Sequence, residues 1–304
     1  MRVFVTGASG WIGSAVVPEL IGAGHQVVGL ARSDAAAEKV AASGAEVLIG
    51  DVQDVDVLRA GAEQADGVVH LAFRHDIAWT GQFEEAAASD RRAIEVFGEV
   101  LSGSDGPLAV ASGVAGVRPG GVATERDIPN DDASPRVASE RAALALAERG
   151  VRSMSVRFAP TVHGIGDHGF IARIVDADRS HGAAGYVAEG ENRWAAVHQN
   201  DAARLVRLGI EHAPAGSVLH AVGEEGVAMR DIAEAISHRF ELPATSISLD
   251  QAGERFGFLA QFVGLDMAAS SAITRELLGW EPTGPTLIED IGGGAYSNGS
   301  GAAG

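Results

Sequence analysis

The amino-acid sequence predicts an α/β fold in which a doubly wound parallel sheet is joined to a smaller C-terminal lobe. The first observation is a strand, a glycine-rich turn and a helix that follow one another within residues 2–23. The second is the alternation of apolar, strand-like runs with helix-like stretches up to residue 158. Right-handed crossovers join such units into one parallel sheet, and ligands bind at the carboxyl ends of its strands.

The glycine-rich turn covers residues 5–13, Val-Thr-Gly-Ala-Ser-Gly-Trp-Ile-Gly. Gly7 permits the tight turn, Gly10 lets the backbone approach a pyrophosphate, and Gly13 lets the helix pack closely on the strand. The unpaired N–H groups at the helix N-terminus favour phosphates. This pattern is typical of a Rossmann-type dinucleotide site, and a glycine-rich turn without a ligand is the alternative.

The end of the second strand, at residues 26–30, discriminates between cofactors. A carboxylate there would bind the ribose 2′-hydroxyl of NAD, whereas an arginine accommodates the 2′-phosphate of NADP. The strand is followed by Arg32 and Ser33, and the first acidic residue is Asp34. We therefore expect NADP(H) to be preferred over NAD(H), with Arg32 and Ser33 at the phosphate. An exposed arginine at the start of a helix is the alternative.

Composition limits the class of protein. A chain of 304 residues that is 46% hydrophobic can bury one large α/β domain with a smaller lobe. The net charge of −18 argues against nucleic acids and anionic membranes as partners, since both are polyanions. The absence of cysteine excludes disulfides and thiolate metal sites. With no leader and no apolar run near the roughly 18 residues of a membrane span, we expect a cytoplasmic protein.

The spacing Thr-Gly-x-x-Gly-x-x-Gly, with glycines three residues apart, resembles the short-chain dehydrogenase/reductase superfamily in its extended (NAD-dependent epimerase/dehydratase-like) and atypical branches. The resemblance covers residues 1–290 and is strongest before residue 165. It implies a set of cofactor contacts at the strand ends and the turns after them. These are Gly7, Ser9, Gly10, Trp11, Ile12, Gly13, Arg32, Ser33, Asp51, Val52, Leu71, Ala72, Phe73, Ala111, Pro160 and Val162.

Two of these turns follow the third and fourth strands, at 46–49 and 67–71. Asp51 resembles the superfamily's aspartate that hydrogen-bonds the adenine amino group, and a cap for the helix at 54–64 is an equal alternative. Residues 72–75, Ala-Phe-Arg-His, resemble the turn that passes beneath the cofactor.

The usual active site of the resembled superfamily is incomplete here. A typical member has a serine after the fifth strand and a Tyr-x-x-x-Lys motif on the next helix. The tyrosine protonates the substrate oxygen, and the lysine holds the nicotinamide ribose and lowers the tyrosine pKa. Ser112 matches the serine, but Arg136 and Glu140 occupy the tyrosine and lysine positions. No other alignment restores the pair, because the only lysine is Lys39.

A histidine could replace the missing tyrosine, because its pKa lies near neutrality. Residues 159–164, Ala-Pro-Thr-Val-His-Gly, resemble the nicotinamide loop of extended members, with His163 in place of their tyrosine. We expect Ser112 to be the oxyanion partner and His163 the acid. A loop histidine that hydrogen-bonds backbone is the alternative. We expect no metal, since His163 and His168 have no further ligand at suitable spacing.

We place the dinucleotide-binding Rossmann domain at residues 1–165 and a substrate-binding lobe, partly interleaved with it, at 166–291. The glycine- and serine-rich segment 292–304 is expected to be a disordered tail. Two long helices, at 84–101 and 137–149, correspond to those that often pair with their copies in the resembled superfamily, so we expect a homodimer.

The partner is expected to be a small-molecule substrate. The candidate substrate-binding residues are Arg74, Arg136, His168, Tyr186, Trp194 and His198. Arg136 offers a planar fork for a carboxylate or phosphate. Tyr186 and Trp194 could equally be ordinary core anchors.

The sequence predicts an NADP(H)-dependent oxidoreductase of atypical short-chain type that reduces a small or medium carbonyl or an imine. One alternative is a sugar-nucleotide epimerase or dehydratase, which the loss of the tyrosine and lysine disfavours. The other is a non-catalytic NADP(H)-binding sensor or regulatory protein, which the same loss favours.

Overall fold

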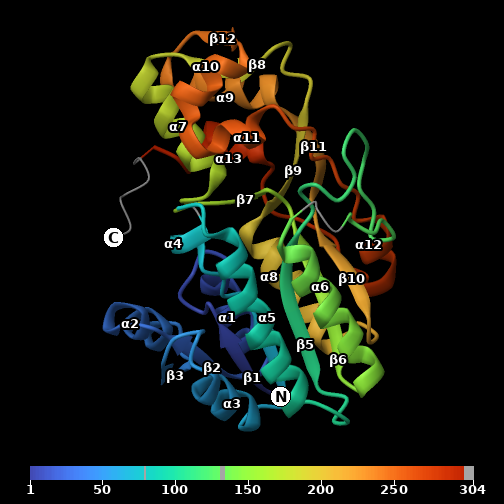
Figure 1. The fold of residues 1–304 in the computed structure, drawn as a ribbon. Helices are drawn as coiled ribbons and strands as arrows, with labels where there is room; N and C mark the ends of the chain where they lie inside the picture. Colours follow the sequence, from blue (N-terminus) through green and yellow to red (C-terminus); the bar gives the residue numbers. More distant parts are fainter. Residues whose placement is uncertain (79, 131–133, 298–304) are drawn as a thin grey trace.

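The computed structural model describes residues 1–78, 80–130 and 134–297. The described chain forms two lobes, a larger one built around a wide sheet and a smaller one above it in Figure 1. The larger lobe contains a seven-stranded sheet in the order β10-β6-β5-β4-β1-β2-β3, and every neighbouring pair is parallel. This confirms the predicted α/β fold with a doubly wound parallel sheet.

The strands of the large sheet lie close to the predicted positions. They are β1 (Arg2–Thr6), β2 (Gln26–Ala31), β3 (Glu46–Ile49), β4 (Gly67–His70), β5 (Pro107–Gly113), β6 (Arg152–Phe158) and β10 (Ser217–Ala221). From β1 the sheet is extended on one side by β2 and β3 and on the other side by β4, β5 and β6. Between β1 and β4 the connections therefore change direction, and a ligand crevice is expected at the carboxyl ends of these two strands.

Helices cover both faces of this sheet. They are α1 (Gly13–Gly22), α2 (Asp34–Ala42), α3 (Val55–Glu63), α4 (His75–Ala78), α5 (Phe83–Val100), α6 (Arg136–Ala145) with the 3₁₀ turn Leu146–Arg149, and α8 (Gln199–His212). Alternate residues of β1 point to opposite faces, so that Val3 and Val5 join the core beneath α1 and α8. Phe4 joins the core beneath α3, α5 and α6.

The smaller lobe is built from later segments of the chain. Its strands are β7 (Thr161–His163), β8 (Ala184–Val187), β9 (Arg193–His198), β11 (Glu224–Ala228) and β12 (Ala244–Ile247). Its helical segments are α7 (Phe170–His181), α9 (Met229–Phe240), α10 (Leu249–Phe256), the 3₁₀ turn Gly257–Leu259, α11 (Ala260–Val263) and α13 (Leu287–Gly293). Helix α12 (Ala272–Leu278) packs beside β10 of the large sheet instead. Strands β11-β9-β7 form one sheet and β12-β8 a second.

Two expectations about local structure were wrong. Residues 161–163 form strand β7 instead of a loop, because they pair with β9 more than thirty residues further along the chain. The expected tail begins inside α13, and Tyr296 is 5% exposed and donates a hydrogen bond to Asp167 Oδ2 at 2.9 Å. Residues 292–297 are therefore part of the packed lobe, while 298–304 lie outside the described residues.

The glycine-rich turn is packed too tightly for side chains at two positions. Gly7 has φ +70°, and a Cβ added there would lie 2.8 Å from the backbone nitrogen of Ala72. A Cβ added to Gly13 would lie 2.1 Å from the carbonyl oxygen of Gly7. The turn can keep this shape only with glycine at both positions.

We predict that Gly13→Ala destabilises the protein by about 1–3 kcal/mol, because the new methyl group forces the turn away from α1. Urea unfolding measures the change. The matched control is Gly22→Ala in the same helix, where an added Cβ meets no atom within 4 Å. The control should be neutral or slightly stabilising. Equal stability of the two variants would show that the turn is not packed as described.

Candidate functional site

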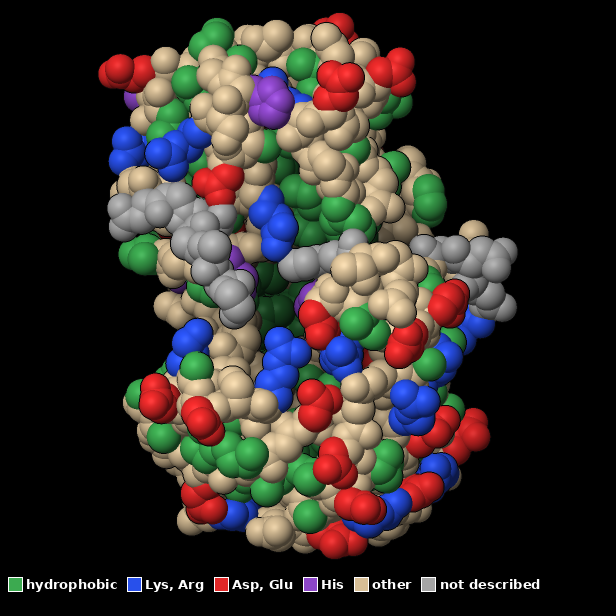
Figure 2. Space-filling view, turned by 60° about the vertical axis from the view of Figure 1, so that its left-hand side comes forward, with side chains coloured by type: hydrophobic (Ala, Val, Ile, Leu, Met, Phe, Trp, Pro, Cys, Tyr) green, Lys and Arg blue, Asp and Glu red, His purple; other side chains and the backbone are tan. Residues whose placement is uncertain are grey.

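The predicted cofactor and catalytic residues of the larger lobe gather along the carboxyl edge of its sheet, facing the smaller lobe. Figure 2 shows a hollow between the two lobes, with Lys and Arg side chains on both sides of it. The chain has a single lysine, Lys39, so at most one of these side chains is a lysine and the others are arginines. The hollow is the candidate functional site.

The glycine-rich turn forms one end of the site. Helix α1 begins after Ile12 without a side-chain cap, so no side chain occupies its first N–H groups. Trp11 ties this turn to the smaller lobe, because its Nε1 donates to the carbonyl of Val162 at 2.7 Å. Gln199 Nε2 donates to the carbonyl of Trp11. An uncapped helix N-terminus behind a tight glycine turn fits a pyrophosphate.

The next strand ends carry a small cluster of charges. Arg32 is 62% exposed, and its Nη1 lies 3.6 Å from Asp76 Oδ2. Arg74 donates to the same carboxylate at 2.9 Å and to the side chain of Gln53. Arg74, a predicted substrate ligand, therefore lies with Arg32 on the cofactor side of the site. Two arginines here give a positive region suited to an additional phosphate.

The polar residues beside this cluster have local roles. Ser33 is the N-cap of α2 and accepts a hydrogen bond from the backbone N–H of Ala36. Asp51 accepts one from the backbone N–H of Gln53 at 2.9 Å. The N-cap of α3 is Asp54, so the capping alternative for Asp51 was wrong.

The positions of the superfamily's catalytic residues contain a buried ion pair. Glu140 Oε1 accepts a hydrogen bond of 2.7 Å from Arg157 Nε, and the two residues are 4% and 2% exposed. Ser112 Oγ donates to the other carboxylate oxygen at 3.3 Å. Arg157 also donates to the backbone carbonyl of Asp127 at 3.0 Å. Glu140 is thus fixed between β5 and β6 and is not free to act as the absent lysine would.

Arg136 lies beside this pair and faces the site. Its Nη2 donates to the carbonyl of Ala111, and its guanidinium carbon lies 4.4 Å from the centre of the Phe73 ring. Burial lowers the pKa of the guanidinium, while the negative charges of Asp90 and Glu140 oppose that shift. Arginine still keeps its proton, so a permanent positive charge stands where the superfamily has tyrosine.

His75 lies in the same region, and its pKa is changed by the charges around it. Its ring packs edge-on against Phe73 at 5.0 Å between ring centres. The side chain is exposed to solvent on one side, while the protein atoms around it still desolvate the ring. This desolvation lowers the pKa of His75 to about 4, and the positive charges of Arg136 and Arg173 act in the same direction. His75 is therefore neutral at physiological pH.

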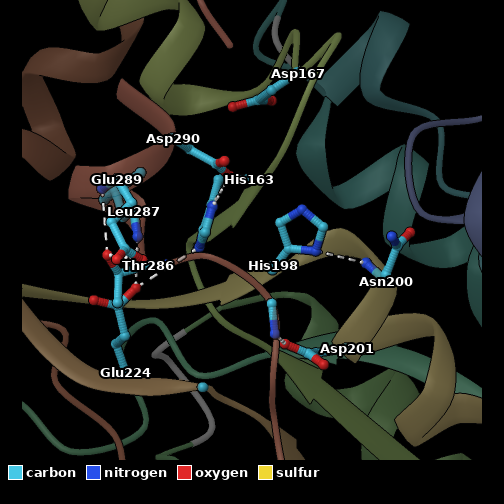
Figure 3. A network of polar contacts seen from close by, with 12 residues as sticks. His163, Asp167, His198, Asn200, Asp201, Glu224, Thr286, Leu287, Glu289 and Asp290 are labelled. Atoms are coloured by element: carbon cyan, nitrogen blue, oxygen red, sulfur yellow. Dashed lines mark hydrogen bonds and ion pairs between the residues drawn. The ribbon is translucent and has the colours of Figure 1, made fainter. Parts of the chain in front are cut away.

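His163, the expected acid, belongs to a separate buried cluster. Figure 3 shows its ring between Asp290 and Glu224, with His198 nearby. Nδ1 lies 2.6 Å from Asp290 Oδ2 and Nε2 lies 3.7 Å from Glu224 Oε2. The side chain has no exposed surface. The alternative of a backbone-bonded loop histidine was wrong, because His163 lies on β7 and binds a carboxylate instead.

The remaining predicted substrate residues are dispersed. Trp194 is fully buried and packs against Phe170, so it is a core anchor. Tyr186 is half-buried beneath Arg230. His198 caps α8 by accepting from the N–H of Asn200. Only His168 joins the cofactor end, where its ring lies 5.7 Å from Trp11.

The sequence prediction missed the partner of Glu140. Arg157 lies between Val156 and Phe158 in strand β6, and an arginine buried there requires an acceptor. That signal points to an acidic partner, but not to its position in the chain. Asp290, the partner of His163, carries no comparable signal, because it lies 127 residues away on an amphipathic helix.

Two further findings concern metals and membranes. Within residues 1–78, 80–130 and 134–297, no group of three or more His, Cys, Asp or Glu side chains could hold a metal ion. In the same part of the chain, no helix is both long enough and apolar enough to span a bilayer.

The sequence is similar to proteins from several organisms. A family model described as NAD dependent epimerase/dehydratase family matches residues 3–96. An uncharacterized protein of Schizosaccharomyces pombe is 43% identical over 297 residues, which cover 97% of this chain and 100% of that protein. An uncharacterized protein of Saccharomyces cerevisiae is 44% identical over 96% of this chain and 98% of its own length. A Stigmatella aurantiaca enzyme, 4-hydroxy-2-methyl-3-oxo-4-farnesyl-3,4-dihydroquinoline-1-oxide ketoreductase, is 39% identical over 24% of this chain and 22% of its own.

Solved structures share the whole fold. MoeE5 in complex with UDP-glucose and NAD has a TM-score of 0.74 and 25% identity, with 96% of both chains covered. UDP-glucose 4-epimerase from Thermotoga maritima has a TM-score of 0.76 and 19% identity, with 98% of both chains covered. The second likeness concerns the fold alone.

Proposed function

Because the chain belongs to the NAD-dependent epimerase/dehydratase family, we propose that it is an NADP(H)-dependent oxidoreductase of atypical short-chain type. Its substrate is a small or medium carbonyl compound, or an imine. The observation that carries the proposal is a tight, uncapped glycine turn on the same sheet edge as Ser112 and Arg136.

The chain's own residues fit the cofactor. The first N–H groups of α1 would bind the pyrophosphate, since a methyl group at Gly7 or Gly13 would disrupt the turn in front of them. Arg32 and Arg74 would bind the 2′-phosphate through the positive region that they share. When bound, the nicotinamide supplies the hydride for the reduction.

Arg136 would act on the substrate oxygen, together with Ser112 once its hydroxyl turns from Glu140 to the substrate. Arg136 and Glu140 lie one turn apart on α6, and they contact the Ala111 carbonyl and the Ser112 hydroxyl respectively, so the hydroxyl and the guanidinium face the same side of this helix. As negative charge develops on the oxygen, the fixed positive charge of Arg136 would stabilise it. Water can then deliver the proton, so no tyrosine is required.

We assign a structural role to His163 in place of the acid role expected from the sequence. A side chain with no exposed surface, hydrogen-bonded to Asp290, does not contact substrate in this conformation. A general acid must first lie within reach of the atom that it protonates.

A non-catalytic NADP(H)-binding protein is the second candidate. It is favoured by the Glu140–Arg157 pair, which uses the lysine position for packing. An epimerase or dehydratase is disfavoured, because those reactions depend on an active-site base.

Cofactor preference gives the first prediction of this proposal. NADPH should bind more tightly than NADH, and Arg32→Ala should weaken NADPH binding at least about tenfold while leaving NADH binding unchanged. Titration with quenching of tryptophan fluorescence measures both affinities. The matched control is Arg59→Ala on α3, which removes one exposed charge that pairs with Glu99. Equal affinity of the wild type for NADPH and NADH would contradict the cofactor assignment.

Turnover separates the enzyme from the sensor. We expect NADPH consumption with at least one member of a panel of ketones, aldehydes and imines. Ser112→Ala should lower that rate about 100-fold, the usual effect of losing one oxyanion donor, without changing NADPH affinity. Tight NADPH binding with no consumption at high protein concentration would refute the reductase and favour the sensor.

A further inference from the structure

We propose that the substrate carries a carboxylate next to its carbonyl group, as in a 2-oxo acid, and that Arg136 binds this carboxylate. The inference rests on the proposed reductase function and narrows its substrate class. It starts from the unused hydrogen-bonding capacity of the Arg136 guanidinium.

Arg136 is held in place but is not saturated. One N–H of Nη2 donates to the carbonyl of Ala111, and the Phe73 ring fixes the guanidinium plane. Nε is buried without a partner, and Nη1 makes no hydrogen bond to any described residue. The end of the guanidinium formed by Nη1 and Nη2 therefore keeps N–H groups on both nitrogens. That planar edge matches the two oxygens of a carboxylate.

The acidic groups near Arg136 are committed to other partners. Glu140 pairs with Arg157, and Asp90 Oδ1 lies 3.1 Å from His70 Nε2. No described residue forms an ion pair with Arg136 within 4.0 Å. As far as the described residues go, this half-buried cation has no counter-ion in contact, which is costly, and an anionic ligand would offset that cost.

Positive charge acts on the groups around Arg136. Desolvation is the first cause of the lowered pKa of His75 and the positive charge of Arg136 the second, while Arg173 acts in the same direction and Asp76 and Asp90 oppose it. Figure 2 shows both basic and acidic side chains beside the hollow. The charge of Arg136 itself, with that of Arg173, favours an anion at the end of the site where reduction is proposed to occur.

The position of Arg136 specifies where the carboxylate lies. The guanidinium is anchored to the Ala111 carbonyl, and Ser112 Oγ lies 3.3 Å from Glu140, which is one turn after Arg136 on α6. A carboxylate on Arg136 therefore brings a directly adjacent carbonyl towards Ser112. In the reaction the carbonyl carbon gains a hydride from the reduced nicotinamide, the π electrons move to oxygen, and a proton from water completes the hydroxyl. The products are a 2-hydroxy acid and oxidised NADP.

The kinetic test compares 2-oxo acids of three to nine carbons with their primary amides, which keep the shape but lack the charge. We expect the wild type to favour the acids at least about 10- to 100-fold in kcat/KM. Arg136→Met should abolish this preference, Arg136→Lys should retain part of it, and the control Arg59→Met should keep all of it. Reduction of amides as efficiently as acids, or an unchanged preference in Arg136→Met, would overturn the inference while leaving the reductase intact.

A binding test needs no turnover. Oxalate, a planar dicarboxylate that cannot be reduced, is titrated into the protein while NMR follows the His75 ring. Bound oxalate should raise the pKa of His75 from about 4 in the wild type and not in Arg136→Met. Inorganic phosphate, which is tetrahedral, should raise it less than oxalate does at the same concentration. A response to phosphate but not to oxalate would overturn the proposal. An oxalate response without turnover of any carbonyl would support the carboxylate site and refute the reductase.

Discussion

The buried ion pair between Glu140 and Arg157 determines what the catalytic end of this site can do. Glu140 stands at the position of the superfamily's lysine, and a charge there without a partner would be expensive because the residue is almost fully buried. Arg157 on β6 neutralises the charge of Glu140 and also donates a hydrogen bond to the backbone carbonyl of Asp127. The pair therefore joins α6 to the sheet and removes the lysine position from the chemistry.

This constraint gives the two halves of the site different characters. The glycine turn and the strand ends near Arg32 obey the rules of a dinucleotide site, because backbone geometry and helix N-termini determine them. The catalytic half has the usual charges reversed, with a cation in place of tyrosine and an anion in place of lysine. Since the anion is neutralised by Arg157, the net positive charge facing the cleft is that of Arg136.

Features that depend on a local sequence pattern could be predicted from the sequence. The strands expected at 26–30, 46–49 and 67–71 were predicted to within one residue, because apolar periodicity and glycine turns are local signals. The places of Ser112, Arg136 and Glu140 on one sheet edge followed from the family resemblance. Features made by distant pairs were not predictable. Strand β7 depends on β9, and the burial of His163 depends on Asp290.

The most direct measurement is a double-mutant cycle on the buried pair, with Glu140→Gln, Arg157→Met and the double variant compared by urea unfolding. Each single change should cost about 3–5 kcal/mol, because it leaves one buried charge unpaired. The double variant should lose at least about 1.5 kcal/mol less unfolding free energy than the sum of the losses in the two single variants. Additive effects within about 0.5 kcal/mol would show that the two charges are not coupled, and would contradict the account of the site.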